Sequence, residues 1–484
     1  MRVFNVSQKN DEYQKTLAEL NISKEPLLSV EEFYQQIHKI FNDCIDFTYR
    51  KVVLFNGKII YLYYLQALIN EELLQEGVVK PLIKLHDEAQ IKEFQQHIYS
   101  IQNEELTKWP EIIYSLFSGG VICHNGGEYP IDVSLTGQDK RAISDPTTEY
   151  QVFGPKVGFI EDITTNIGIM RKLIKDPRLK AKSFEVGTVT HTKTSLMYLD
   201  DLVDHEYLQY LEQKINDIDL EYLLNIGELN KNIIDAPFSV FPQVLLTERP
   251  DKAAYAMTEG KILILMEGST FCSILPVGLL DFYITSGDYS FSSFWNLSFI
   301  RLIRYASMIL STALPALYVA LIAFHPELIP TTLILTIIES RMNIPFPAVA
   351  EALIMMFALD VLVEASIRLP SFVGQTIGIV GGLVIGTAAV EAGVISSLMV
   401  IIIAFTAIAS FTAPAWELVS ALRVIRYGLL VISAMYGLYG FVLGFCLIFI
   451  HICNIETIPR VYIEPFSKAK KEQLKKSLRK KLNF

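Results

Sequence analysis

The stretch PFPAVAEALIMMFALDVLVEASIRLP at residues 345–370 is mostly apolar but carries three acids, Glu351, Asp360 and Glu364. A charged side chain near the centre of a bilayer costs about 2.5–3.5 kcal/mol on insertion scales, so acids at that depth usually face protein or water and often mark a conduction path. The alternative is an amphipathic helix that lies at the membrane interface with its carboxylates in water. The sequence around this stretch bears on the choice.

The chain of 484 residues has an ordinary charged part followed by an apolar part. Charged residues occur throughout residues 1–290, whereas four later segments contain none and are each long enough to cross an apolar core about 30 Å thick. These segments are residues 305–324, 372–390, 392–416 and 427–450. The region 328–369 between them is predicted to form either a re-entrant or amphipathic pair or two further spans.

The fold predicted from this division is an α/β (α+β) two-lobed soluble N-terminal domain, followed by an all-α polytopic membrane domain. The membrane domain has about four firm transmembrane helices plus a re-entrant or amphipathic pair. The predicted parts are a flexible N-terminal segment (1–25), a first α/β lobe (26–118), a second α/β lobe (119–290), the transmembrane domain (291–459) and a basic tail (460–484).

Turn signals predict β-hairpins in both lobes. Asn56-Gly57 separates KVVLF from KIIYLYYL, and Asn125-Gly126-Gly127 separates GVICH from EYPIDVSL. Asn-Gly pairs supply the positive φ angles that a tight hairpin needs. The apolar runs 262–266 and 271–275 are too short to span a bilayer and flank Glu267-Gly268-Ser269, so a buried hairpin is predicted there instead.

Metal, cofactor and nucleotide chemistry are not indicated. The five cysteines are scattered, with no CxxC pair and no histidine cluster at ligand spacing. There is no GxxxxGK[ST], and Gly154, Gly158 and Gly168 do not fit GxGxxG. Because Asp360 is the only Asp in the membrane part, it has no second Asp with which to form the pair that an intramembrane hydrolase would need. We therefore predict no cofactor, no metal and no catalytic residue, and expect that the chain is not an enzyme.

Charge predicts the orientation of the membrane part. The N-terminal residues MRVFNVSQKNDEYQ lack the apolar core of a secretory signal. From Arg460 onward, nine Lys or Arg stand against two acids, which is typical of a cytoplasmic anchor on anionic lipid rather than of nucleic-acid binding. With Arg301 and Arg304 before the first span, both four and six crossings place the N-terminal domain and the tail in the cytoplasm. Arg423 and Arg426 then fall on the outer side, where they would snorkel or sit in protein.

Glycines recur every four residues in two of the predicted spans, which predicts close packing because small residues let helix backbones approach each other. They are Gly374, Gly378, Gly382 and Gly386 in one span and Gly440 and Gly444 in the last.

The three acids of residues 345–370 lie on two sides of a helix. At about 100° per residue, Asp360 and Glu364 are one turn apart on one side, and Glu351 is about half a turn around. Acids on two sides do not fit a thin interfacial plane, which favours burial against protein or water. If several copies surround an axis, Asp360 or Glu364 would form an acidic ring that favours cations. The neighbouring residues able to supply an apolar constriction are Leu353, Phe357 and Val361.

Ordered motifs over residues 119–466 resemble the A subunit of the GerA family of spore germinant receptors. They are Thr247-Glu248-Arg249-Pro250-Asp251, Glu267-Gly268, RLIRY (301–305), PALY (315–318), FHPELIPT (324–331), Pro345-Phe346-Pro347-Ala348, Glu351-Ala352-Leu353, Arg368-Leu369-Pro370, the glycine run 374–386 and AVEAG (389–393). Phe153 and Val157 depart from the family pattern, which has an arginine and an acid there.

The resemblance implies a multi-pass protein of the inner membrane of the dormant spore that acts with a transporter-like B subunit, which senses the nutrient, and a lipoprotein C subunit. It further implies a homo-oligomeric ring of A subunits through which monovalent cations leave. The candidate pore or gate residues are then Glu351, Leu353, Phe357, Asp360, Val361 and Glu364. The alternatives are a secondary transporter, which should show two similar halves in the membrane part, and a non-conducting scaffold subunit.

Overall fold

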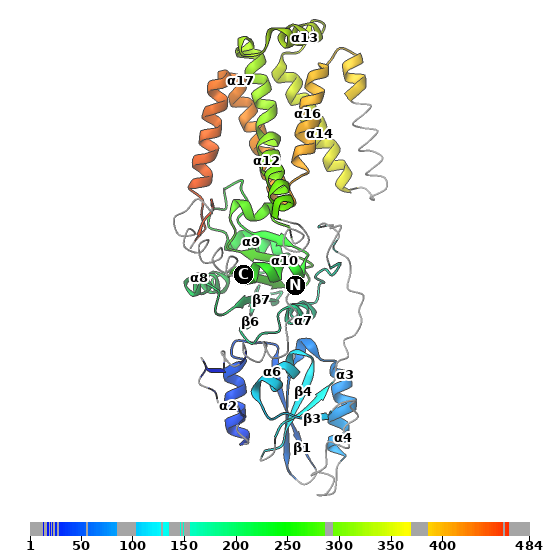
Figure 1. Ribbon diagram of the computed structural model, residues 1–484, viewed down its shortest axis with the longest axis vertical. Helices are drawn as coiled ribbons and strands as arrows, with labels where there is room; N and C mark the ends of the chain where they lie inside the picture. The colour runs from blue at the N-terminus through cyan, green and yellow to red at the C-terminus, as the bar shows by residue number, and fades with distance from the viewer. Residues whose placement is uncertain are drawn as a thin grey trace. The chain divides into compact units, whose positions relative to one another are not determined.

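The computed structural model describes residues 29–54, 57–84, 103–126, 129–134, 155–285, 294–368, 386–457 and 460–463, together with a few single residues among the first 149 (Figure 1). The chain forms two compact units. The first contains residues 1–234 and 246–276, and the second contains residues 235–245 and 277–484.

The first sheet of the first unit has the strand order β1-β2-β4-β5-β3 with antiparallel neighbours. Its apolar side chains alternate along the strands, so α2 and α6 cover one face while α3 and α4 cover the other. The elements are α2 (Val30–Ile40), β1 (Phe47–Val53), β2 (Ile59–Leu65), α3 (Glu71–Leu74), α4 (Lys80–Ile83), β3 (Asn103–Glu105), α6 (Trp109–Phe117), β4 (Gly120–His124) and β5 (Ile131–Ser134).

The second sheet has the strand order β6-β7-β9-β10-β8. The pairing of β9 with β10 is antiparallel, as the predicted hairpin requires, and every residue of both strands is buried. The elements are α7 (Ile163–Leu173), β6 (Leu179–Val186), β7 (Thr192–Leu199), α8 (His205–Asn216), α9 (Ile226–Ile233), β8 (Leu245–Thr247), α10 (Pro250–Thr258), β9 (Ile262–Met266) and β10 (Cys272–Leu275).

The two hairpins predicted for the first 134 residues are both present, as β1-β2 and β4-β5. However, the predicted boundary between residues 118 and 119 does not separate the two sheets, because β4 and β5 belong to the first. Strand β2 buries side chains on both of its faces, Leu62 on one and Tyr63 on the other. It is therefore a central strand that needs a neighbour on each side, and β4 supplies the second.

A buried ion pair joins the two sheets of the first unit. Arg171 of α7 contacts Asp46, which precedes β1, with Nη2–Oδ1 and Nε–Oδ2 distances of 2.8 and 3.0 Å. Beside it, the amide of Ile45 donates to the carbonyl oxygen of Ala181 in β6 at 3.0 Å. A Cβ added to Gly168 of α7 would lie 2.3 Å from the carbonyl oxygen of Ala67. The two lobes therefore pack backbone to backbone as one body.

The second unit is mainly helical and contains α12 (Phe294–Phe324), α13 (Thr331–Arg341), α14 (Ala348–Arg368), α16 (Ser397–Ser410) and α17 (Trp416–Cys453), followed by β11 (Glu456–Thr457) and β12 (Arg460–Val461). Apolar residues of α12, α14, α16 and α17 form one buried cluster. Two described helices are long and apolar enough to cross a membrane, Trp295–Phe324 and Trp416–Cys453.

The expectation of four firm spans is not confirmed. Helix α16 has only 14 residues where residues 392–416 were expected to cross, because Ser396 caps its start and Pro414 follows its end. The larger part of the predicted span 372–390 lies outside the described residues. The ambiguous region 328–369 contains two helices, α13 and α14, of which α14 is 21 residues long.

Helix α17 folds back on itself at Gly437, where φ is 61° and ψ is −138°. A Cβ added to Gly440 would lie 2.3 Å from the carbonyl oxygen of Ile432, although these residues would be about 12 Å apart along a straight helix. A Cβ on Gly444 would likewise meet Leu429 at 2.6 Å. The expected single crossing over residues 427–450 is therefore wrong, since a positive φ at one glycine turns the helix into two packed arms, a first arm of residues 416–436 and a second of residues 438–453 (Figure 1).

The close contact of the two arms predicts a specific sensitivity to added side-chain volume. Gly440→Ala should destabilise the protein by about 1–3 kcal/mol, because its methyl group would overlap a backbone oxygen that cannot turn away. Gly428→Ala is the matched control, since a Cβ there meets nothing within 4 Å. Thermal unfolding of the purified full-length variants should show a lower midpoint for Gly440→Ala only, and equal midpoints would contradict the packed-arm geometry.

Buried His124 makes the first sheet sensitive to acid. Its ring stacks on Phe33 with centroids 4.6 Å apart, and neither ring nitrogen has a hydrogen-bond partner. Burial lowers the pKa of the His124 imidazole from 6.5 to about 4. In the unfolded chain the imidazole takes up a proton near pH 6.5, so stability is full above that pH and falls as the pH approaches 4.

Replacing His124 with Phe should remove this dependence. From pH 7 to pH 5 the wild type should lose about 2 kcal/mol more unfolding free energy than His124→Phe. Urea unfolding of the full-length protein measures this through the fluorescence of Trp109, which stacks on Phe33 at 5.1 Å, with the other tryptophans replaced by Phe. His205→Phe, at an exposed position on α8, is the control. Parallel pH profiles for wild type and His124→Phe would refute the assignment.

Candidate functional site

Helix α14 begins directly after the Pro345-Phe346-Pro347 motif. The carbonyl oxygen of Pro347 accepts from the amide of Glu351 at 3.1 Å, which closes the first turn. Because proline disfavours a helical conformation in the residue before it, the motif keeps α14 from beginning earlier and fixes where the helix starts.

Glu351, in the first turn of α14, is completely buried. Its Oε1 atom lies 2.8 Å from Nη2 of Arg341, at the end of α13. Its Oε2 atom accepts hydrogen bonds from the amide and hydroxyl of Ser396 at 3.0 and 2.9 Å, and Ser396 caps α16. The Glu351 carboxylate thus ties together three helices.

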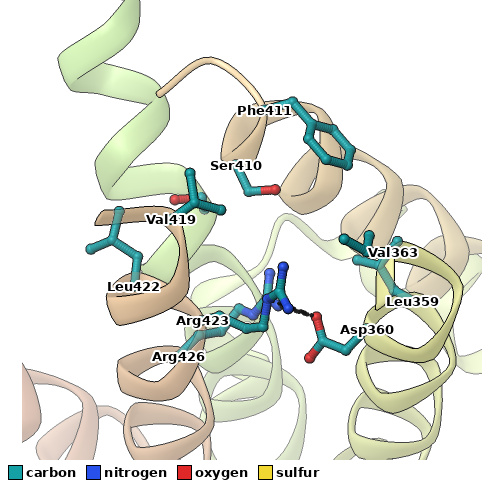
Figure 2. Close-up of a pocket in the computed structure, with 10 residues that line it drawn as sticks. Leu359, Asp360, Val363, Ser410, Phe411, Val419, Leu422, Arg423 and Arg426 are labelled. Carbon is teal, nitrogen blue, oxygen red and sulfur yellow. Dashed lines mark hydrogen bonds and ion pairs between the residues drawn. The ribbon is translucent and has the colours of Figure 1, made fainter. Parts of the chain in front are cut away.

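Asp360, near the middle of α14, faces the first arm of α17 (Figure 2). Its Oδ1 atom lies 3.3 Å from both Nε of Arg423 and Nη2 of Arg426. Its Oδ2 atom accepts from the hydroxyl of Tyr427 at 2.6 Å. A cavity of about 20 Å³ adjoins this cluster, and its polar lining comes from Asp360, both arginines, Ser311 and Ser410.

The side of α14 next to Asp360 is exposed. Phe357 is 66% and Val361 51% exposed, and Ile354 and Glu364 lie on the same side at spacings of three and four residues. Leu353 is half-buried and packs against the core of the helical unit. The six candidate pore or gate residues therefore divide into three that face the interior of their own chain and three that do not.

The motif Thr247-Glu248-Arg249-Pro250-Asp251 forms the start of α10. The Arg249 guanidinium lies 2.8 Å from Asp251 and donates to the carbonyl oxygen of Pro155 at 3.1 Å. The carbonyl oxygen of Glu248 accepts from the amide of Phe159 at 2.8 Å. These contacts hold the segment before α7 against α10, and Pro250 occupies the first helical turn, where its missing N–H costs nothing.

The predicted glycine contacts have separate outcomes. Gly374, Gly378 and Gly382 lie outside the described residues, whereas a Cβ on Gly386 would contact Val400 of α16 at an ordinary 3.5 Å. Phe153 also lies outside them. Within the described residues, no group of three or more His, Cys, Asp or Glu is placed to hold a metal ion.

A family model described as "Bacillus/Clostridium GerA spore germination protein" matches residues 35–482. The chain belongs to this family. Spore germination protein KA of Bacillus subtilis is 36% identical over 86% of this chain and 77% of its own length. The uncharacterized membrane protein YfkQ of the same species is 32% identical over 96% of this chain and 92% of its own length. The N-terminal domain of the A subunit of the Bacillus megaterium spore germinant receptor GerK3 aligns with a TM-score of 0.42 and 24% identity, over 52% of this chain and 96% of that one.

The partners of the α14 acids were not assigned from the sequence. Arg341, Ser396 and Tyr427 lie 10 to 67 residues away along the chain, and spacing within one helix carries no information about them. The sequence did single out the two arginines, because Arg423 and Arg426 fall on the outer side in the predicted topology, where basic residues are not expected. The structure places Arg426 inside the protein, with 3% of its side chain exposed.

The Glu351 contacts predict that removal of this one carboxylate strongly destabilises the helical unit. Glu351→Ala should destabilise the helical unit by about 3–5 kcal/mol, because Arg341 loses its carboxylate and the α16 cap loses its acceptor. Glu339→Ala, at an exposed position on the neighbouring α13, should change stability by less than about 1 kcal/mol. Thermal unfolding of the detergent-purified variants makes the comparison. Equal midpoints would show that Glu351 does not hold the three helices.

Proposed function

We propose that this chain is the A subunit of a nutrient-sensing spore germinant receptor, and not an enzyme, and that several copies form a nutrient-gated cation conduit in the inner spore membrane. Membership of the GerA family carries the receptor assignment. The names of the relatives, several of which are spore germination proteins, support it. A transporter-like B subunit and a lipoprotein C subunit complete the receptor in this proposal, with nutrient sensing on the B subunit.

The conduit is proposed to run along the exposed side of α14 in a ring of copies. The interior of a single chain is a poor cation path, because two arginines stand beside Asp360 and repel cations. The exposed side offers Phe357 and Val361 as an apolar constriction and Glu364 as an acid that favours cations. Glu351 and Asp360 hold the helix in place and do not line the path.

Gating follows from a shift between two arrangements of the ring. Nutrient binding to a partner subunit stabilises the open arrangement only if that partner contacts the open and closed rings differently. In the proposed topology the N-terminal domain and the basic tail face the cytoplasm, and the tail lies on anionic lipid. The spans run through the bilayer as a multi-pass bundle.

The gate is tested by shortening its apolar side chains. Val361→Ala should give nutrient-independent K⁺ efflux from liposomes that contain the complete receptor, because a smaller side chain widens and wets the constriction. Val424→Ala is the matched control, since Val424 is similarly exposed, at 59%, but lies on α17. Wild-type efflux should need nutrient.

Two outcomes would contradict this assignment. Normal gating in Val361→Ala and Phe357→Ala, with efflux intact, would place the conduction path elsewhere. A wild-type receptor that binds nutrient but passes no cation would favour the non-conducting scaffold, whereas saturable exchange of a solute would favour the secondary transporter.

A further inference from the structure

The cluster at Asp360 carries more positive than negative charge. In the described part of the chain, Arg423 and Arg426 both make their ion pair with Asp360, and with no other carboxylate. Tyr427 contributes a neutral hydroxyl that donates to the same aspartate. Because arginine stays protonated in proteins, the cluster keeps one net positive charge.

This net positive charge lies in a largely buried, apolar part of the helical unit, where a charge is energetically unfavourable. The Arg426 side chain is 3% exposed, and apolar residues of α14 and α17 line the same cavity, among them Leu359, Val419 and Leu422 (Figure 2). An uncompensated ion inside an apolar bundle costs several kcal/mol, so such ions are normally paired. The Nε atom of Arg426 is buried and has no hydrogen-bond acceptor.

The polar groups that adjoin the cavity favour an anion. The hydroxyls of Ser311 and Ser410 donate to backbone carbonyl oxygens of their own helices at 2.9 and 2.7 Å. The donors left for a ligand are therefore N–H groups of the two guanidiniums. A cavity of about 20 Å³ holds a particle of about the size of one water molecule and is too small for a phosphate group.

We propose that the cavity beside Asp360 is a binding site for a single monatomic anion, such as chloride, which Arg423 and Arg426 hold together. The anion supplies the second negative charge of the cluster and so stabilises the contact between α14 and the first arm of α17. This inference does not depend on the conduit, because the site lies among helices α12, α14, α16 and α17 of one chain.

The test compares chloride with gluconate, which is too large for the cavity, at matched ionic strength. The full-length protein is placed in nanodiscs of neutral phosphatidylcholine and its thermal unfolding midpoint is followed as chloride replaces gluconate. We expect a saturable rise in the midpoint with chloride. Arg423→Gln should abolish the rise, because Asp360 then neutralises Arg426 alone. Asp360→Asn should bind chloride roughly tenfold tighter or more, since a nearby negative charge is removed.

Arg301→Gln is the control for loss of one positive charge outside the cavity, and it should keep the chloride response. Equal midpoints in chloride and gluconate, for both the wild type and Asp360→Asn, would overturn the proposal. So would an undiminished chloride response in Arg423→Gln, which would indicate a bulk salt effect. A midpoint that follows added anionic lipid but not chloride would overturn it in favour of a headgroup at the cavity mouth. If Arg423→Gln does not fold, Arg423→Lys, which shortens the side chain and removes the fork of donors, should weaken the response.

Discussion

A carboxylate cannot remain charged and unpaired inside an apolar helical bundle, and this constraint organises the second unit. Glu351 and Asp360 lie about half a turn apart on α14, and each meets basic and hydroxyl partners from other helices. Through these contacts α14 is fixed to α13 and α16 near its start and to α17 near its middle. The helix is therefore held both by these polar contacts and by the apolar packing of residues such as Ala352 and Met356.

The same constraint divides the acids of α14 by role. The carboxylates of Glu351 and Asp360 are already paired with arginines of other helices, so they do not attract a mobile cation. Phe357, Val361 and Glu364 are exposed. A helix that is held by two side chains and exposed elsewhere is suited to carry a gate, because its position can change as a whole when its anchoring helices move.

Much of this architecture could be predicted from the sequence, since it depends on local rules. The hairpins follow from turn residues and alternating apolar strands, and the family assignment follows from ordered motifs. The reversal of α17 could not be predicted, because an uninterrupted apolar run looks the same whether it crosses once or turns at Gly437. The predicted boundary between residues 118 and 119 does not separate the two sheets for a related reason. Strand β4 pairs with β2, and this pairing connects residues about 60 positions apart. The ion-pair partners of the acids are also non-local.

Cysteine accessibility along α14 in the reconstituted receptor tests whether the exposed side of this helix lines a water-filled path. With Cys446 and Cys453 replaced by Ser, single cysteines are introduced and exposed to a charged, membrane-impermeant thiol reagent with nutrient present. We expect Phe357→Cys, Val361→Cys and Glu364→Cys to be modified, since in the proposed ring they line water. The fully buried positions Ala352→Cys and Met356→Cys should be protected. Modification of the buried positions with protection of the exposed ones would contradict it.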